Sequence, residues 1–406
     1  MAIDTPARIA VLGAGPIGLE AALYARYLGY DVDVYERGQV AEHIEQWGHV
    51  RMYTPFGANR STLGLAALKA QDPNWRPPGD DEVLTGREYR TRYLLPLALS
   101  DLLAEGVHEH TDVVAIGREG WLKTEGPKSE NRADSDFRLL LRATDTGGHS
   151  HERFATAQAV LDTTGTYRCA NWLGPDGLPA LGELAARPHV EYGLPDVRGA
   201  ARERYAGRNI LLVGDGDSAV TTLVALADLA SQTSDTWITW ATRTPPPDPP
   251  WSMPNALEPL VDRERIHEQA RRLSAGDANH VTHLPDTSVE SIVWHPDLER
   301  FSVRLAGKDA NQPDEREFDR VIANVGYRGQ PELFEELQVD RVGVIGAPLA
   351  NRFITSEPDF YVLGAKSWGR DGQFRIAIGL EQIREVFSVI GDRANLDLYA
   401  TMGKLA

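Results

Sequence analysis

The sequence is poor in cysteine, because Cys169 is the only one among its 406 residues. One cysteine excludes an intrachain disulfide framework and a C-x-x-C redox pair. Electrons that pass through this protein therefore do not pass through a dithiol of its own. We expect Cys169, which follows the segment "TTG", to be a small buried side chain rather than a nucleophile.

The sequence also lacks an excess of positive charge and any long apolar run. Its 42 Lys and Arg residues stand against 59 Asp and Glu residues, which gives a net charge of −17. That charge repels nucleic acid and anionic membranes, so neither is expected as a partner. No segment approaches about 18 uninterrupted apolar residues, and the N-terminal "MAIDTPARIAVLG" has no signal-peptide pattern. We therefore expect a cytoplasmic protein without a membrane-spanning helix.

Signatures of metal sites and of hydrolytic nucleophiles are absent as well. The histidine pairs stand in polar stretches without an accompanying Cys, Asp or Glu ligand pattern. These pairs are His108/His110, His149/His151 and His280/His283. No Ser-His-Asp order or G-x-S-x-G elbow is visible. No metal site is expected.

What the sequence does contain is one plan used twice. Each half opens with an apolar strand, a Gly-rich turn, a helix and a second strand, which predicts a parallel β-α-β unit. A short meander and a return strand follow, and the return strand ends near Gly165 in the first half and Gly326 in the second. The expected strands cover residues 8–15, 31–37, 111–119, 137–144 and 158–168, then 208–216, 236–243, 287–294, 300–307 and 319–331. The pattern predicts an α/β protein with two Rossmann-like domains, each a doubly wound parallel sheet plus a β-meander.

The chain length suits two domains, or three at most. We expect a discontinuous first domain of residues 1–175 and 320–406, and a second domain of residues 176–319. The amphipathic helix expected at 374–390 would pack back on the first domain. Its pattern "FRIAIGLEQIREVFSVI" has the spacing of a helix with one buried face.

Three polar or Pro-dense segments are expected to be loops. Residues 242–254 are too rich in proline for a helix or a central strand, so we expect an extended loop. Residues 126–136 and 307–317 hold matching places in the two meanders and predict exposed hairpin tips.

The first Gly-rich turn has the pattern of a dinucleotide-binding loop. Gly13, Gly15 and Gly18 form G-x-G-x-x-G between a strand and a helix. The first glycine allows the tight turn, the second lets a pyrophosphate approach the backbone, and the third lets helix and strand pack closely. Glu36 ends the next strand, 18 residues after Gly18, where a carboxylate can accept hydrogen bonds from ribose hydroxyls.

The second Gly-rich turn differs at the strand that follows it. Gly214, Gly216 and Ala219 fit G-x-G-x-x-A, and alignment of the halves puts Thr242 where Glu36 stands, with Arg243 beside it. No carboxylate is expected there to repel a 2′-phosphate, and a guanidinium can bind one through a forked pair of hydrogen bonds. The pattern favours NADPH over NADH; the alternative is a surface ion pair of Arg243 and acceptance of NADH. The first turn then suits the ADP half of a flavin dinucleotide, because a hydride must travel between two bound ring systems.

With these two loops in this order, the chain resembles the two-dinucleotide-binding-domain flavoprotein superfamily. The order of the turns, "DTTGTYR", "VIANVGYRGQP" and "FYVLGAKSWG" carry that likeness over nearly the whole chain. Within the superfamily it is most similar to flavin-containing (class B-like) monooxygenases and related pyridine nucleotide-dependent FAD oxidoreductases. That likeness is carried by "CANWLGPDGLPALGE", by "EQWGHVRMYTPFGANRS", and by the run from "YGLPDV" to "GDGDSA".

Two departures from that resemblance matter. Such monooxygenases carry a histidine in a fingerprint upstream of the second turn, and residues 192–207 contain none, which disfavours the Baeyer–Villiger subtype. The superfamily's Gly-Asp near the C-terminus, whose Asp holds the flavin ribityl chain, is replaced by Gly364-Ala365, followed by Lys366. The resemblance therefore implies FAD binding with different ribityl contacts.

The glycine patterns and the resemblance together give a set of expected contacts. For FAD these are Gly13, Gly15, Pro16, Ile17, Gly18, Glu36, Arg37, Arg51, Thr54, Val113, Val114, Thr164, Gly165, Gly364 and Lys366. For NADPH they are Gly214, Gly216, Asp217, Ser218, Ala219, Thr242, Arg243 and Gly326. Arg51 and Lys366 are the catalytic candidates, since either cation would stabilise negative charge on the reduced flavin or a peroxide. Trp368, Tyr327 and Phe374 are candidates for the wall of a substrate cavity.

The resemblance implies a monooxygenase. NADPH would reduce FAD, and the reduced flavin would form a C4a-(hydro)peroxide with O2 that passes one oxygen atom to a small nitrogen or sulfur nucleophile. One alternative is an NAD(P)H-dependent flavoprotein reductase that hands electrons to a quinone, a small oxidant or a partner protein. Another is a flavoprotein that binds both nucleotides without turnover, which the intact glycines disfavour. The sequence leaves the substrate and the oligomeric state open, with a homodimer as one option.

Overall fold

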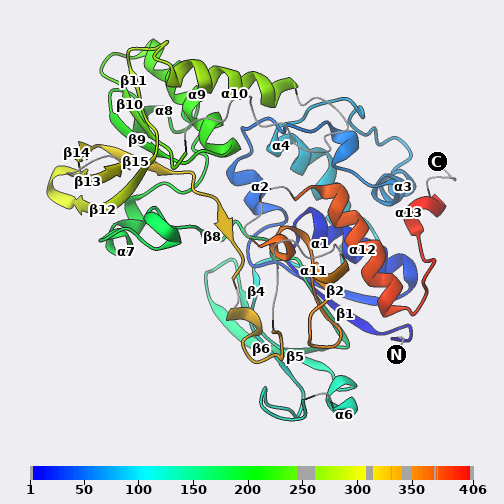
Figure 1. Cartoon of the computed structure of the whole chain (residues 1–406). Helices are drawn as coiled ribbons and strands as arrows, with labels where there is room; N and C mark the ends of the chain where they lie inside the picture. The colour runs from blue at the N-terminus through cyan, green and yellow to red at the C-terminus, as the bar shows by residue number, and fades with distance from the viewer. Residues whose placement is uncertain are drawn as a thin grey trace. The chain divides into compact units, whose positions relative to one another are not determined.

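The computed structural model (Figure 1) describes residues 3–127, 129–244, 261–307, 314–330, 332–340, 350–369, 372 and 374–402. The chain divides into two compact units, one formed by 1–169 and 328–406 and the other by 170–327. Each unit holds a parallel sheet followed by an antiparallel meander, so the predicted α/β class is confirmed. In the described part of the chain, no helix is both long and apolar enough to cross a membrane.

The first unit is built on a five-stranded parallel sheet in the order β17-β7-β1-β2-β3. Its strands are β1 (Arg8–Leu12), β2 (Asp31–Tyr35), β3 (Val107–His108), β7 (Ala159–Asp162) and β17 (Phe360–Val362). Alternate side chains of these strands are buried on opposite faces, as expected for a sheet covered on both sides. Ile9 and Val11 face the helices, whereas Ala10 and Leu12 face the meander.

Helices cover one face of this sheet. The long ones are α1 (Pro16–Leu28), α3 (Thr62–Gln71) and α12 (Ile376–Ile390), and the shorter ones include α2 (Glu42–Gln46), α4 (Gly86–Tyr89), α11 (Ala350–Phe353) and α13 (Leu398–Met402). Helix α1 has Pro16 at its first position and ends at Gly29, whose φ of 90° is the left-handed conformation that glycine adopts easily. Tyr24 of α1 stacks on Phe387 of α12 at 5.1 Å between ring centres, which confirms that the late amphipathic helix packs on the first unit.

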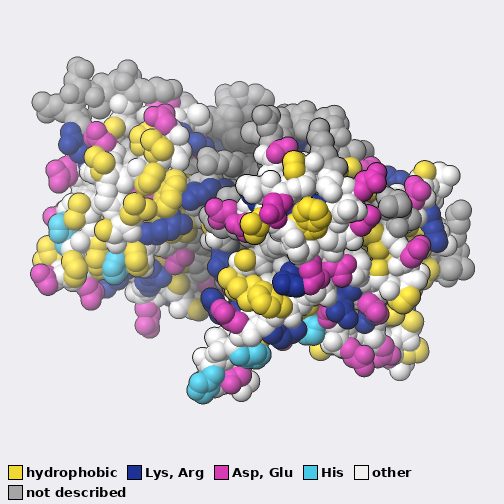
Figure 2. All heavy atoms as spheres, turned by 90° about the horizontal axis from the view of Figure 1, so that it is seen from below, with side chains coloured by type: hydrophobic (Ala, Val, Ile, Leu, Met, Phe, Trp, Pro, Cys, Tyr) yellow, Lys and Arg dark blue, Asp and Glu magenta, His cyan; other side chains and the backbone are white. Residues whose placement is uncertain are grey.

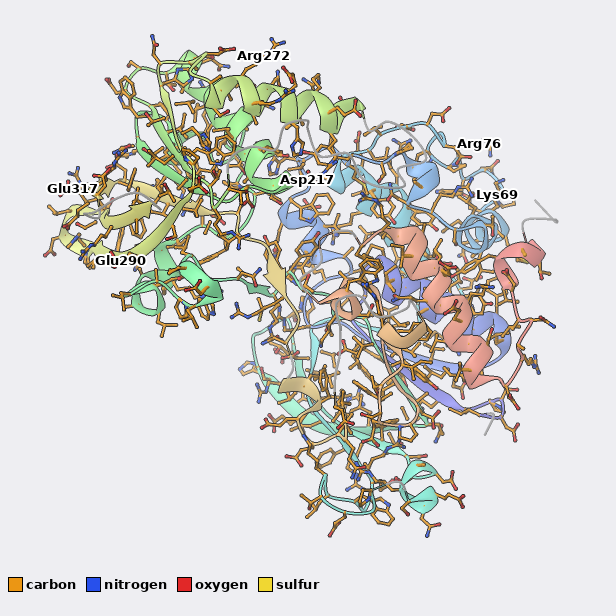
Figure 3. The ribbon with its side chains drawn as sticks, viewed as in Figure 1. Lys69, Arg76, Asp217, Arg272, Glu290 and Glu317 are labelled. Atoms are coloured by element: carbon orange, nitrogen blue, oxygen red, sulfur yellow. The ribbon has the colours of Figure 1, made fainter. Side chains whose placement is uncertain are left out.

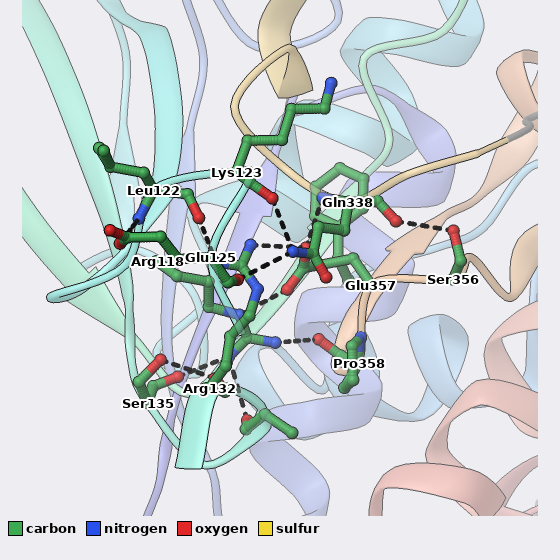
Figure 4. Close-up of polar contacts among 12 residues, drawn as sticks. Arg118, Leu122, Lys123, Glu125, Arg132, Ser135, Gln338, Ser356, Glu357 and Pro358 are labelled. Atoms are coloured by element: carbon green, nitrogen blue, oxygen red, sulfur yellow. Dashed lines mark hydrogen bonds and ion pairs between the residues drawn. The ribbon is translucent and has the colours of Figure 1, made fainter. Parts of the chain in front are cut away.

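The meander of strands β4 (Thr111–Arg118), β5 (Phe137–Thr144) and β6 (Ser150–Ala157) covers the other face. The segment that joins β4 to β5 corrects one expectation, since it is not simply an exposed hairpin tip. It contains helix α6 (Glu130–Ala133), in which Arg132 is 3% exposed. Arg132 and the buried Arg118 both bind the carboxylate of Glu357, at 3.1 and 2.9 Å (Figure 4). This buried ion triad ties the segment to the chain just before β17.

The second unit repeats the plan with a four-stranded parallel sheet in the order β11-β10-β9-β15. The strands are β9 (Asn209–Val213), β10 (Trp237–Ala241), β11 (Val281–Leu284) and β15 (Arg320–Ala323), and the helices on one face are α9 (Asp217–Gln232) and α10 (Val261–Ser274). Strands β12 (Thr287–His295), β13 (Arg300–Gly307) and β14 (Asp314–Phe318) form the meander on the other face. Residues 308–313 of the second expected hairpin tip, and 245–254 of the Pro-dense segment, lie outside the described residues.

The boundaries between the units differ from those expected from the sequence. Residues 170–175 and 320–327 belong to the second unit, because β15 pairs with β9 in parallel. The chain passes between the units through β8 (Cys169–Ala170) and β16 (Tyr327–Arg328), which pair as a two-stranded sheet. Cys169 is half-buried there, which differs from the buried position expected for it.

Candidate functional site

The first Gly-rich loop has the backbone geometry that its three glycines were expected to provide. Gly13 has a φ of +94°, and a Cβ there would lie 3.2 Å from the Thr163 carbonyl oxygen. Gly15 precedes helix α1, and a Cβ there would meet nothing within 4 Å. A Cβ on Gly18 would lie 1.9 Å from the Gly13 carbonyl oxygen, so helix and loop touch at that point. The open position therefore lies at the middle glycine, where a pyrophosphate would approach the helix start.

Glu36 stands directly after β2 and turns back to the loop. Its Oε2 accepts a hydrogen bond from the Ala14 N–H at 2.8 Å, and its Oε1 accepts one from the Gly38 N–H at 2.9 Å. Each carboxylate oxygen has a second lone pair, so Glu36 keeps acceptor capacity for ribose hydroxyls. Its backbone is fixed by two further bonds, from its N–H to the His108 carbonyl and from the Thr111 N–H to its own carbonyl.

A buried ion pair lies beside this loop, at the ends of β7 and β17. Lys366, 3% exposed, donates from Nζ to Asp162 Oδ2 at 2.6 Å and to Thr164 Oγ1 at 3.2 Å. Gly364, in the short helix Gly364–Trp368, has a φ of +73°, and a Cβ there would lie 3.5 Å from Ile17. The structure therefore brings Ile17, Thr164, Gly364 and Lys366 together around the loop. The Asp162 partner of Lys366 was not expected from the sequence.

The remaining first-unit candidates lie on neighbouring elements. Val113 and Val114 are half-buried on β4, where the pairing with β5 shifts by one residue, so Val114 occupies a β-bulge. Arg51 is exposed and pairs through its backbone with Thr85. Thr54 fixes its own loop, because its hydroxyl lies 3.1 Å from Asn59 Oδ1. Arg37 is exposed, Pro16 is the first residue of α1, and Gly165 has a φ of +70°. Their contacts with a flavin stay a prediction.

The second Gly-rich loop has the same backbone design. Gly214 has a φ of +133°, and a Cβ there would lie 2.2 Å from the Asn324 carbonyl oxygen. A Cβ on Gly216, which precedes α9, would meet nothing within 4 Å, as at Gly15. Ala219 is fully buried and takes the place of the third glycine, while Ser218 is half-buried in the first turn of α9. Gly326 has a φ of +78°, and its carbonyl accepts from the Asn171 N–H.

Thr242 occupies the position in this loop that Glu36 has in the first. Its N–H donates to the Leu284 carbonyl and its carbonyl accepts from the Thr287 N–H, which repeats the two backbone bonds of Glu36. No carboxylate occupies this position, but one lies nearby. Asp215, inside the loop, lies 4.0 Å from the Arg243 guanidinium, whose side chain is 78% exposed. Aligning the two halves does not reveal this carboxylate at the Glu36 position, because Asp215 stands where the first loop has Ala14.

Asp217, labelled in Figure 3, is the first residue of α9 and has two basic partners that were not expected from the sequence. Arg263 and His267, both 8% exposed, lie on α10 and contact its carboxylate at 3.0 and 2.7 Å. Burial raises the pKa of Asp217, but the hydrogen bond from His267 and the charge of Arg263 outweigh it, so the pKa is lowered overall. The i, i+4 spacing of Arg263 and His267 is the only sequence signal for this pair. Two basic side chains thus stand at the helix start.

The aromatic candidates divide between the units. Trp368 and Phe374 belong to the first unit, where the Arg352 guanidinium lies 4.0 Å from the centre of a Trp368 ring. Tyr327 belongs to the second, and its hydroxyl donates to the Tyr192 carbonyl at 2.9 Å. Within the described ranges, no three His, Cys, Asp or Glu side chains are close enough together to hold a metal ion. Of the histidines, His108 is bound to Asp33 at 2.7 Å.

The chain is similar to known proteins in its structure and not detectably in its sequence. No protein-family model and no curated protein sequence matches the chain. Among solved structures, the bacillithiol disulfide reductase of Bacillus cereus is 16% identical, with a TM-score of 0.65, over 95% of this chain and 99% of its own. The FAD-bound cadaverine monooxygenase of Erwinia amylovora is also 16% identical, with a TM-score of 0.66, over 96% and 95%. The Kutzneria ornithine N-hydroxylase is 13% identical, with a TM-score of 0.64, over 96% and 100%.

These neighbours span reductases and monooxygenases that share one architecture over their whole length. The chain therefore has the fold of the two-dinucleotide-binding flavoprotein oxidoreductases, as the order of its glycine loops predicted.

Proposed function

We propose that this protein is an FAD-dependent, NADPH-using monooxygenase that transfers one oxygen atom of O2 to a small nitrogen or sulfur nucleophile. The observation that carries the proposal is the pair of open helix starts at Gly15 and Gly216. Each offers unpaired helical N–H groups and a glycine whose missing Cβ leaves room for a phosphate. One loop is followed by a carboxylate and the other by a guanidinium, which suits two different dinucleotides.

The residues of the first loop fit FAD. The N–H groups after Gly15 would bind the pyrophosphate, and the free lone pairs of Glu36 would accept from the adenosine ribose. Lys366 stands beside the loop with its charge balanced by Asp162. A cation in this place would stabilise negative charge on a reduced flavin, while the pair with Asp162 limits the cost of its burial.

The residues of the second loop fit NADPH. The N–H groups after Gly216 would bind the pyrophosphate, and Arg243 would turn from its loose 4.0 Å contact with Asp215 to the 2′-phosphate. An exposed ion pair at that distance contributes about 0 to 1 kcal/mol, so it gives way readily. When bound, the two cofactors supply hydride transfer and the activation of O2. The protein supplies binding, orientation and the exclusion of water.

Oxygen transfer is favoured over disulfide reduction by the cysteine content. A dithiol cycle within one chain needs two cysteines, and this chain has only Cys169. Two structural neighbours oxidise amines, namely cadaverine and ornithine, which favours an amine as the substrate here. The second candidate is a flavoprotein reductase that passes electrons to a quinone, a small oxidant or a partner protein. It is favoured by the bacillithiol disulfide and thioredoxin reductases among the neighbours.

The cofactor assignment is tested with three glycine variants. Gly15→Ala should fold with unchanged stability, because the added methyl meets open space, and should purify without FAD. Gly216→Ala should keep FAD and lose affinity for NADPH. Gly117→Ala on β4 also adds a methyl to open space, outside the loop, and serves as the control. Equal FAD content in Gly15→Ala and Gly117→Ala would refute the first site.

The reaction type is tested by mixing the NADPH-reduced protein with oxygenated buffer in a stopped-flow instrument. A monooxygenase should show a transient spectrum distinct from reduced and oxidised flavin, and an added amine should gain one oxygen atom from labelled O2. Direct return to oxidised flavin, with rapid reduction of an added quinone, would establish the reductase instead.

A further inference from the structure

A cleft of about 590 Å3 lies on the meander side of the first unit's parallel sheet. Its walls come from β2 and β3 of the sheet and from β5 and β6 of the meander. A volume of this size lies within the range of about 300–1,000 Å3 that is typical of small-molecule sites. Nothing in the proposed function uses it.

The cleft adjoins the dinucleotide loop of the same unit at Tyr35, the residue before Glu36, but extends away from it. It reaches Arg8, the first residue of β1, whereas the loop begins at Gly13 beyond the other end of that strand. Five residues of extended chain span about 16 Å at 3.3 Å per residue. A dinucleotide held at Gly15 therefore leaves the Arg8 end of the cleft open.

Three arginines, Arg8, Arg138 and Arg153, contribute to the lining of the cleft. The only acidic side chain in its lining, Asp33, is held by His108 at 2.7 Å and by Arg8 at 3.7 Å. The hydrogen bond from His108 outweighs burial, and with the nearby arginine charges it lowers the pKa of Asp33, so this carboxylate stays ionised and paired.

The remaining positive charge is not balanced by the surroundings. Arg138 pairs with Glu119, whereas the exposed side chain of Arg153 makes no hydrogen bond or ion pair with any described residue and contributes to lowering the pKa of Asp33. Three arginines against the two carboxylates of Asp33 and Glu119 leave a positive excess. Figure 2 shows that Lys and Arg side chains gather in small groups between Asp and Glu side chains on the face that it draws. A positive cleft on a chain of net charge −17 is unexpected without an anion to bind.

An aromatic ring stands beside this charge. Phe154 of β6 is 66% exposed, and the Arg138 guanidinium carbon lies 5.7 Å from its ring centre. On the opposite wall Tyr35 stacks on His108 at 5.3 Å between ring centres. Burial and the charge of Asp33 raise the pKa of Tyr35 to about 12, so its ring carries a neutral hydroxyl. Exposed and stacked rings next to a guanidinium suit a flat ring that carries an oxyanion.

We propose that this cleft is a second ligand site, separate from the dinucleotide loops, for a small planar molecule with a carboxylate or phosphate group. Arg153 binds the oxyanion through its fork of N–H donors, with Arg8 adding charge, and the stacked rings of Tyr35 and His108 lie beside the ring of the ligand. The strongly negative net charge disfavours a long polyanion, which would meet acidic surface beyond the cleft.

The test is calorimetric titration of the purified protein, with FAD and NADP+ in excess to fill the dinucleotide sites. The probes are 2-naphthoate, 2-naphthyl phosphate and neutral 2-naphthol. We expect binding of one or both anions, the tighter one identifying the group, and much weaker binding of 2-naphthol. Arg153→Gln should weaken anion binding about tenfold to a hundredfold, because a charge-assisted hydrogen bond contributes about that factor.

Arg142→Gln is the matched control, since Arg142 is exposed on β5 and bound to Glu152 at 2.8 Å, outside the cleft lining. The proposal is overturned if Arg153→Gln and Arg142→Gln bind the anions alike, if 2-naphthol binds as well as 2-naphthoate, or if no probe binds at millimolar concentration. None of these readouts depends on turnover, so a failed monooxygenase assay leaves the result unaffected.

Discussion

Glu20 gives the stability of the first unit a predictable dependence on pH. It lies on α1, is 3% exposed, and its Oε1 has no hydrogen-bond partner within the described part of the chain. Burial raises its pKa from 4.5 to about 7, and the hydroxyls of Ser61 and Tyr399 only partly oppose this. The native protein therefore holds Glu20 protonated at a pH where the unfolded chain has it ionised.

The sign and size of the effect follow from that shift. Below about pH 4.5 Glu20 is protonated in both states and costs nothing. Between pH 4.5 and 7 the unfolded state releases its proton first, so the free energy of unfolding falls by about 1.4 kcal/mol per pH unit. Above pH 7 both states are ionised, and a constant penalty of about 3 kcal/mol remains. Glu20→Gln is neutral at every pH and should escape this loss.

The assay is urea unfolding of the wild type and of Glu20→Gln at pH 5, 6, 7 and 8. The variant should gain stability over the wild type as the pH rises, by about 3 kcal/mol between the two ends. Glu105→Gln, at an exposed glutamate, is the control and should show no such trend. A constant difference between Glu20→Gln and wild type across the pH range would show that Glu20 titrates normally, and the reasoning from burial would be wrong.

Three further predictions concern the ion triad and the two loops. Glu357→Gln should destabilise the protein by about 3–5 kcal/mol, seen as a lower melting temperature, because it leaves the buried guanidiniums of Arg118 and Arg132 without a counter-charge. Arg243→Ala should raise the KM for NADPH and leave the KM for NADH nearly unchanged, and equal effects on the two would refute the 2′-phosphate assignment. Arg263→Gln should raise both KM values alike, because it disturbs the start of α9, where NADPH and NADH would bind in the same way. Gly18→Ala should lower both the melting temperature and the FAD content, unlike Gly15→Ala, because its methyl would clash with the Gly13 carbonyl.

The loops could be predicted from the sequence because their function depends on the backbone. A backbone that must turn at Gly13, stay open at Gly15 and touch a helix at Gly18 leaves glycine as the residue at each place. The alternation of short apolar strands with helices then fixed the parallel sheets, and the equivalence of Thr242 and Glu36 followed from the repeated plan.

The charged contacts could not be predicted, because they join residues far apart in the chain. Arg118 and Glu357 are separated by 239 residues, and no local pattern marks them as partners. Residues 126–136 are polar in composition, so the burial of Arg132 among them has no sequence signal. The same holds for Lys366 and Asp162, which meet only because β7 and β17 are neighbours in the sheet.

The two loops differ in a way that bears on which dinucleotide each one takes. In the first loop the carboxylate stands after the second strand, at Glu36, and the loop residue Ala14 offers it an N–H. In the second loop the carboxylate is in the loop itself, at Asp215, and the cation stands after the second strand, at Arg243. The carboxylate and the group that pairs with it therefore occupy opposite positions in the two loops, although the backbone of the loops is alike. A 2′-phosphate at the strand end would meet negative charge in the first loop and positive charge in the second, so the proposed order of FAD and NADPH cannot be reversed without an electrostatic cost.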